Sequence, residues 1–186
     1  MQIVVQNHSE SINTDWINSQ FNKFALTMDE AIPVIFFPNK EAFDTALGIS
    51  SPPWVVATQD ENNIYIVDPS EWNPETCTSS IEEIIAHEAT HVFHQRTRPD
   101  VELWIFEGFA MLVADQIASM NGTKVTLINP FELTYENDNF YVIVGQIMSK
   151  LIAKHGSERV IQSILTTDSY QDDPILGTNA ILEILK

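Results

Sequence analysis

The sequence has a single cysteine, few basic residues and no long apolar run, and each scarcity excludes a class of protein. With only Cys77 available, no disulfide can form within the chain. Lysine and arginine number 9 against 26 aspartates and glutamates, and the net charge of −17 argues against a nucleic-acid or anionic-membrane partner. No apolar run reaches the length of about 18 residues that a membrane-spanning helix needs. We therefore expect a soluble globular protein that is not inserted in a membrane.

The start of the chain leads to an expectation about compartment. Residues 1–6 lack the basic segment and the apolar core of a signal peptide. We therefore expect a cytoplasmic protein, with secretion as the alternative if a signal segment has been removed. No feature of the sequence indicates an oligomeric state.

Hydrophobic periodicity divides the chain into a strand-rich part and a helical part. The length of 186 residues and a hydrophobic content of 44% suit one globular domain with a sizeable core. Runs of strand type come first, and runs of helix type dominate after about residue 80. We predict strands over residues 1–6, 31–37, 54–58, 63–67 and 124–128, and helices over residues 14–26, 39–47, 80–95, 101–120, 140–154, 157–165 and 178–185.

This order of elements predicts an α+β fold in a single domain over residues 1–186. Residues 1–95 would form a small mixed sheet with helices, ending in the helix that carries the candidate site. Residues 96–186 would form a helical half.

The residues before position 87 predict the start of a helix. Either Ser79 with Glu82 or Ser80 with Glu83 fits a capping box, in which a serine and a glutamate three residues later satisfy each other's backbone N–H groups. The apolar run that follows has the spacing of a helix.

On this helix stand His87-Glu88-Ala89-Thr90-His91, which match the pattern H-E-x-x-H. Side chains four residues apart share one face of a helix, with Cβ atoms about 5–6 Å apart. His87 and His91 can therefore bind one ion together. Glu88 lies beside the pair, where it can reach a water on that ion. The pattern predicts a zinc site with Glu88 as the general base.

A third protein ligand is expected, because catalytic zinc sites use three and keep one position open for water. Glu107 follows in an apolar segment that is predicted to be a buried helix. A buried carboxylate is costly to ionise without a partner, and a metal ion is such a partner. Gly108, next to it, would let the two ligand helices approach closely. We therefore predict Glu107 as the third ligand.

His94 and Asp115 are candidates for supporting these ligands. His94 follows His91 by three residues and lies near the ligand face. It could replace Glu107 as a ligand, although a place beside the ligands or in solvent suits it better. Asp115 lies about two turns after Glu107 and could accept the second N–H of a ligand histidine, with an exposed helix position as the alternative.

The combination of motifs resembles a known family. H-E-x-x-H followed by W-x-x-E-G-x-A, which is read at residues 104–110, resembles the gluzincin zinc metallopeptidases, especially the small peptidase MA-like and minigluzincin group. The likeness extends over most of residues 30–165, and its specific motifs lie within residues 87–110. It implies a zincin-like fold and peptidase activity.

The resemblance also implies roles for individual residues. One Zn²⁺ would be held by His87, His91 and Glu107, and Glu88 would take the proton of the attacking water. The run Trp54-Val55-Val56-Ala57-Thr58 would be the edge strand against which an extended peptide lies.

A tyrosine that stabilises the transition state belongs to the aminopeptidase-type members of this family, three residues before a glycine. Tyr141 stands four residues before Gly145, so it is one candidate, and Tyr135 is the alternative. The same enzymes carry a G-x-M-E-N strand that holds the free amine of the substrate, and this sequence has no such segment. Aminopeptidase activity is therefore not expected.

Together these patterns predict a zinc-dependent metallopeptidase acting on a peptide or protein substrate. Three alternatives remain open from the sequence. One is a self-inhibited form in which residues 166–186 lie in the cleft. The others are a non-catalytic zinc-binding protein of the same fold and a zinc hydrolase that cleaves an ester or a small amide.

Overall fold

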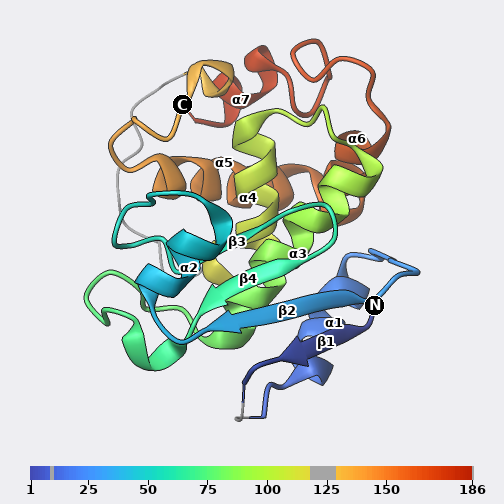
Figure 1. Cartoon of the computed structure of the whole chain (residues 1–186). Coiled ribbons are helices and arrows are strands. Elements are labelled where there is room, and N and C mark those ends of the chain that lie inside the picture. Colours follow the sequence, from blue (N-terminus) through green and yellow to red (C-terminus); the bar gives the residue numbers. More distant parts are fainter. Residues whose placement is uncertain (9–10, 118–128, 186) are drawn as a thin grey trace. The chain divides into compact units, whose positions relative to one another are not determined.

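The computed structural model describes residues 1–8, 11–117 and 129–185, and it divides into two compact units. Unit 1 spans Met1–Arg96 and unit 2 spans Thr97–Lys186. The described residues contain four strands and seven α-helices (Figure 1), so the α+β class with a small mixed sheet is confirmed. All four strands and the first three helices begin in unit 1, and the last four helices lie in unit 2.

Unit 1 is built on a mixed sheet with the strand order β1-β2-β4-β3. Its strands are β1 (Ile3–Gln6), β2 (Ile32–Phe37), β3 (Ala57–Gln59) and β4 (Ile64–Val67). β1, β2 and β4 run parallel, and β3 runs antiparallel to β4. Along β2 the side chains of Ile32, Val34 and Phe36 are buried and alternate with partly exposed neighbours, as the two-residue period of a strand requires.

The strand next to β4 begins later than the sequence predicts. A strand was expected over residues 54–58, but β3 begins at Ala57, so Trp54 and Val55 lie outside it. The Val55 N–H donates to the Pro52 carbonyl oxygen at 3.0 Å, which turns the chain before the strand can start. β3 pairs antiparallel with β4 and lies at the edge of the sheet, as expected for this strand.

Two of the three helices of unit 1 begin at an asparagine cap. The three helices are α1 (Thr14–Lys23), α2 (Lys40–Leu47) and α3 (Ile81–Thr97). The Asn13 side chain accepts the Trp16 N–H, and the Asn39 side chain accepts the Ala42 N–H. Gly48 ends α2 with a φ of 66°, the left-handed conformation that glycine adopts without strain.

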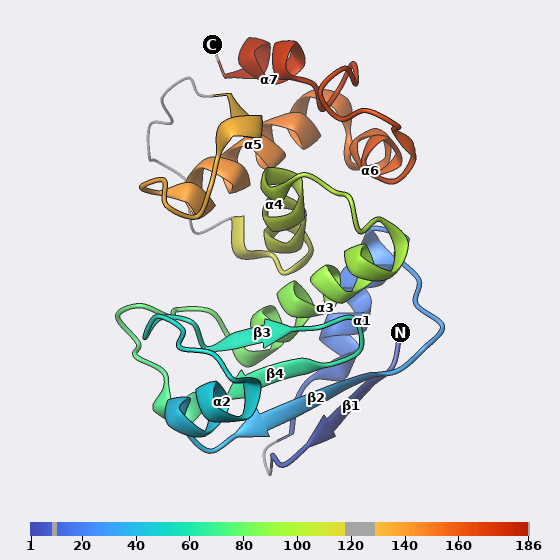
Figure 2. The ribbon, with the colours of Figure 1, turned by 45° about the horizontal axis from the view of Figure 1, so that its top comes forward.

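Unit 2 is helical in the residues that the structure describes. Its helices are α4 (Leu103–Val113), α5 (Phe140–His155), α6 (Ser157–Thr166) and α7 (Thr178–Ile184), and a short 3₁₀ turn, η3, covers Pro130–Glu132. α4 packs most extensively against α5, which lies beside it in Figure 2. As predicted, α4 is buried on nearly all sides.

The helix predicted over residues 101–120 is shorter than expected. α4 ends at Val113, and Asp115 has a left-handed backbone with a φ of 60°. A right-handed helix cannot pass through that conformation, so the apolar pattern overstated the length of the helix. The strand predicted over residues 124–128 lies outside the described residues.

Gly108 allows close helix packing, but with a different helix from the one predicted. A Cβ atom at this position would lie 3.0 Å from the Val144 carbonyl oxygen and 3.5 Å from Met148 Cε. Both neighbours belong to α5, whereas the sequence pointed to the other ligand helix. Gly108 therefore fits α4 onto α5 inside unit 2.

The last twenty residues supply part of the core of unit 2. Leu176 and Ile181 are fully buried, and Tyr170 is 6% exposed. The Tyr170 hydroxyl donates to the Ile164 carbonyl oxygen at 3.0 Å, which ties this segment to α6. α7 also packs against α5.

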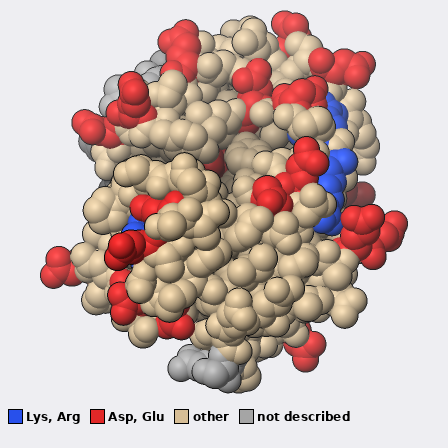
Figure 3. Space-filling view, viewed as in Figure 1, with Lys and Arg blue, Asp and Glu red and all other residues tan. Residues whose placement is uncertain are grey.

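Acidic side chains are spread over the face drawn in Figure 3, and few basic side chains accompany them. This distribution agrees with the net charge of −17, and the basic side chains visible on that face gather mainly along its right-hand edge. Among the described residues, no helix combines the length and the apolar character that crossing a membrane requires.

Candidate metal centre

α3 carries the two histidines of the motif, and its first turn is capped as one of the two predicted pairs. The Ser80 N–H donates to Glu83 Oε2 at 2.7 Å, and the Glu83 N–H donates to Ser80 Oγ at 3.2 Å. This reciprocal pair is the capping box. It starts the helix at Ile81, six residues before the motif.

The spacing of four brings the two imidazoles together on α3. The rings of His87 and His91 lie edge to face, with centroids 4.6 Å apart and an interplanar angle of 89°. His91 is 4% exposed, and His87 is half-buried. Glu88 lies between them in the sequence and is half-buried, so solvent reaches it.

Both ends of α3 are fastened to unit 1. Near its start, Glu82 Oε1 accepts the backbone N–H of Asn13, the cap of α1, at 3.0 Å. Near its end, Arg96 Nε donates to the Glu61 carbonyl oxygen, in the turn of the β3–β4 hairpin, at 2.8 Å. These two bonds hold the helix that presents the histidines.

Glu107 is placed by α4, among apolar neighbours. Its side chain is only 4% exposed, and Trp104, Ile105 and Phe109 on the same helix are buried. Glu107 Oε1 accepts a hydrogen bond from the Tyr135 hydroxyl at 2.5 Å, within the range of a charge-assisted O–H···O⁻ bond. A buried carboxylate with this geometry is held in one orientation.

His87, His91 and Glu107 form a group that could hold a metal ion. Each offers one ligand atom, and the three atoms lie within 4.8 Å of one another. Two imidazole nitrogens and one carboxylate oxygen are the donor set of several catalytic zinc sites, so these residues fit the expected ion. The structure thus brings together the three ligands predicted from the sequence.

The two candidate tyrosines lie near each other in unit 2. Tyr135 follows η3, and Tyr141 stands in the first turn of α5, with ring centroids 6.3 Å apart. The hydroxyl of Tyr135 bonds a predicted ligand, Glu107. The sequence gave no signal for this bond, because Tyr135 and Glu107 are 28 positions apart in the chain.

The two residues proposed to support the ligands are placed very differently. His94 is completely buried on α3, one turn beyond His91, and the group of three ligands does not include it. Asp115 is exposed and lies beyond the end of α4. The helical position that was assumed for Asp115 is therefore wrong.

The predicted substrate strand is reduced to Ala57 and Thr58, which belong to β3. Val56 continues the pairing without being in the strand, because its carbonyl oxygen accepts the Val67 N–H at 2.9 Å. Trp54 is 49% exposed in the segment before it. β3 keeps one edge outside the pairing of the four described strands.

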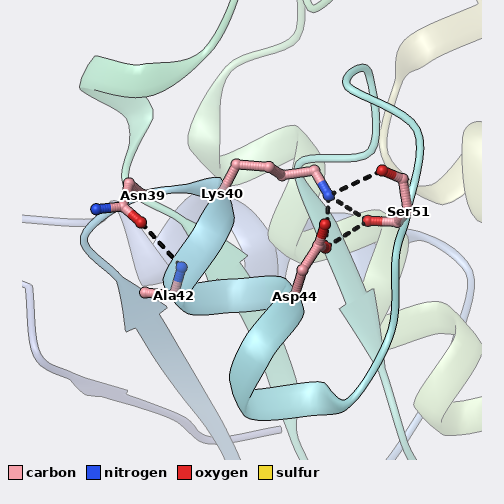
Figure 4. A network of polar contacts seen from close by, with 5 residues as sticks. All are labelled: Asn39, Lys40, Ala42, Asp44 and Ser51. Carbon is pink, nitrogen blue, oxygen red and sulfur yellow. Dashed lines mark hydrogen bonds and ion pairs between the residues drawn. The ribbon is translucent and has the colours of Figure 1, made fainter.

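A polar network that the sequence did not predict fastens the segment before β3 (Figure 4). Lys40 Nζ bonds Asp44 Oδ1 at 2.6 Å and also contacts the side chain and the carbonyl oxygen of Ser51. Ser51 Oγ donates to Asp44 Oδ1 at 2.7 Å. Lys40 and Asp44 are four residues apart on α2, and this spacing could have predicted the ion pair.

Cys77 does not add a ligand to the group, which contains no cysteine. Burial raises the pKa of the Cys77 thiol, and the nearby carboxylate of Glu83 acts in the same direction. A thiol with a raised pKa is a weaker metal ligand and nucleophile at neutral pH.

Comparison of the sequence with protein-family models and with curated proteins finds no match. We therefore infer the chemistry of the site from its own residues.

Proposed function

We propose that this protein is a zinc-dependent peptidase with a zincin-like fold. The observation that carries the proposal is the group formed by His87, His91 and Glu107, whose ligand atoms lie within 4.8 Å of one another. Three protein ligands leave the fourth position of a tetrahedral ion for water, as in catalytic rather than structural zinc sites.

Glu88 is the proposed general base. When bound, zinc supplies Lewis acidity that activates water and polarises the scissile carbonyl. Glu88 follows His87 directly and is half-buried, which suits a carboxylate that must meet solvent water. It accepts the proton of the attacking water and returns it to the departing amine. Tyr141 offers a phenolic O–H that can donate to the developing oxyanion.

The free edge of β3 supports a peptide as the substrate. An extended peptide can add to an exposed sheet edge by backbone hydrogen bonds, with its side chains alternating in direction. β3 is short, and Val56 extends its pairing by one residue. A segment of a few substrate residues fits this edge.

The self-inhibited alternative receives less support. It requires residues 166–186 to act as a removable strap, yet this segment supplies the buried side chains of Tyr170, Leu176 and Ile181 to unit 2. Detaching it would expose part of the hydrophobic core of that unit.

The test combines metal analysis with a peptide-library cleavage assay on the wild type, Glu88→Ala and Glu75→Ala. Glu88→Ala should retain stoichiometric zinc and lose about 10²- to 10⁴-fold in cleavage rate, the usual contribution of a general base. Glu75→Ala removes an exposed loop carboxylate and should behave as wild type. Cleavage by Glu88→Ala at the wild-type rate, or a wild type that does not bind zinc, contradicts the proposal.

The same assay separates peptidase activity from the hydrolysis of esters or small amides. A zinc-loaded wild type that cleaves small esters but no peptide in the library would favour the non-peptidase hydrolase. Loss of ester cleavage in Glu88→Ala would still support Glu88 as the base.

A further inference from the structure

We infer that Tyr135 is a positioning residue that orients the Glu107 carboxylate for metal binding. The inference rests on the proposed metal site and adds a residue that sets its affinity. Its basis is the 2.5 Å hydrogen bond from the Tyr135 hydroxyl to Glu107 Oε1.

The Glu107 side chain needs such a partner. Its backbone is fixed in the middle of α4, but three side-chain torsions separate the backbone from the carboxylate. A hydrogen bond to Oε1 restricts rotation about the last of these bonds. The bond uses one acceptor site of a carboxylate that is 4% exposed and leaves its other acceptor sites for a metal ion.

Tyr135 is itself held by a local turn and by an aromatic neighbour. The Thr134 N–H donates to Asn137 Oδ1 at 2.7 Å, and the Asn137 N–H donates to the Thr134 carbonyl oxygen at 3.1 Å. This turn brackets Tyr135. The Tyr135 ring meets the ring of Phe140, at the start of α5, with centroids 5.1 Å apart. The hydroxyl therefore approaches Glu107 from a supported loop.

The exposure of Tyr135 separates a role in positioning from a role in packing. Its side chain is 54% exposed, so its ring contributes less to the core than the ring of Phe140, which is 3% exposed. Removing only the hydroxyl leaves the ring and its contact with Phe140 in place. A change in metal binding after that substitution would report on the hydrogen bond.

This geometry also distinguishes Tyr135 from Tyr141. A phenolic hydroxyl has one proton to donate, and the proton of Tyr135 is directed at Glu107. It cannot be given to an oxyanion at the same time. Tyr135 therefore acts through Glu107, and Tyr141 remains the candidate for contact with the substrate.

The experiment measures the zinc dissociation constant of the full-length protein by competition with a chromogenic chelator. Tyr135→Phe should bind zinc about 10- to 100-fold more weakly, the usual effect of removing a partner of a metal ligand. Tyr141→Phe is the matched control, because it removes a phenolic hydroxyl from the neighbouring ring, and its affinity should equal that of the wild type. Equal affinities of Tyr135→Phe and the wild type would overturn the inference.

A spectroscopic readout distinguishes orientation from stability. The absorption bands of cobalt(II) in place of zinc should shift in Tyr135→Phe and stay unchanged in Tyr141→Phe, since they report the ligand field. Asn137→Ala, which loosens the turn but keeps Tyr135, should weaken zinc binding by a smaller factor. It supplies the test if Tyr135→Phe does not fold.

These results also separate the two proposals. A wild type that binds no zinc overturns both. A wild type that binds zinc, with Glu88→Ala inactive and Tyr135→Phe of unchanged affinity, overturns only the role of Tyr135.

Discussion

Ser80 and Glu83 cap each other at the start of the helix that presents His87 and His91. Each backbone N–H is accepted by the side chain of the other residue, at 2.7 Å and 3.2 Å. The first turn of a helix has N–H groups without helical partners, and this exchange satisfies two of them. The stability of the ligand helix therefore depends on a contact two turns from its second histidine.

Replacing Ser80 by alanine tests this dependence. Ser80→Ala should lower the free energy of unfolding by about 1 kcal/mol, the typical effect of losing a serine cap. Ser50→Ala, at an exposed loop serine, should leave it nearly unchanged. Urea denaturation of the metal-free protein measures both. Equal stability of the two variants would show that the capping box contributes nothing measurable.

Gly108→Ala should destabilise unit 2 although alanine favours helices. The propensity gain is about 1 kcal/mol. The new Cβ atom opposes this gain, because it would lie 3.0 Å from the Val144 carbonyl oxygen. That oxygen belongs to the backbone, so it cannot move away by a side-chain rotation. Overpacking of this kind costs about 1–3 kcal/mol.

Thr45→Ala, at an exposed position of α2, is the control for this variant because it changes propensity without a new contact. Thermal unfolding should show a lower midpoint for Gly108→Ala and an equal or slightly higher one for Thr45→Ala. Because Glu107 is adjacent, zinc affinity should fall only in Gly108→Ala. A higher midpoint for Gly108→Ala would mean that α4 and α5 can move apart freely.

Asp173 should make the stability of unit 2 depend on pH in the acid range. Burial raises the pKa of Asp173, but hydrogen bonds from Ser163 Oγ and from the backbone N–H groups of Leu176 and Ile175 outweigh it. The pKa is therefore lower in the folded than in the unfolded protein. The stabilisation is complete above about pH 4, the ordinary pKa of an aspartate, and is lost as the pH falls through the folded pKa.

Asp173→Asn should accordingly be less stable than the wild type at pH 6, and the difference should shrink towards pH 2. Asp168→Asn, in the same acidic loop but exposed, should show a smaller difference at pH 6. Chemical denaturation at several pH values gives the comparison. A stability gap between Asp173→Asn and the wild type that widens as the pH falls would mean that folding raises the pKa of Asp173.

The Lys40–Asp44–Ser51 network should control the order of the segment before β3. Hydrogen bonds from Lys40 and Ser51 lower the pKa of Asp44, so the carboxylate is charged at neutral pH. In Asp44→Asn the ion pair is lost, and backbone amides of residues 49–56 should exchange faster with deuterium. Glu41→Gln, which removes an exposed carboxylate of the same helix, should leave exchange unchanged. Unchanged exchange in Asp44→Asn would show that the network is not needed to order the segment, which also contains Pro52 and Pro53.

Elements whose limits depend on neighbouring residues were predicted well. The Ser80–Glu83 pair, one of the two capping boxes predicted from the sequence, acts within three positions of the backbone groups that it satisfies, so the local sequence contains the information. The pairing of His87 and His91 was also predictable from the local sequence, because residues four apart lie on the same face of a helix.

Features that depend on distant residues were predicted less well. The apolar run of α4 continues past Val113, but the left-handed backbone at Asp115 ends the helix, and hydrophobicity does not encode that ending. The helix that Gly108 admits could not be identified before the packing of α4 on α5 was known. The Tyr135–Glu107 bond likewise depends on where a loop 28 residues away is folded. Residue type alone made Gly108 and Tyr135 candidates, and the tertiary structure showed which residues they contact.

The register of the sheet has a consequence for how the chain folds during synthesis. β1 pairs with β2, Ile3 opposite Ile32, and β2 pairs with β4, Val34 opposite Ile64. These parallel pairings close long loops and form slowly compared with helices. All four described strands nevertheless precede residue 68, so a ribosome has joined every strand residue before it adds His87. The nascent chain can therefore pair the four described strands before the proposed metal ligands emerge, which would limit the time in which these ligands could capture an ion in an unfolded state.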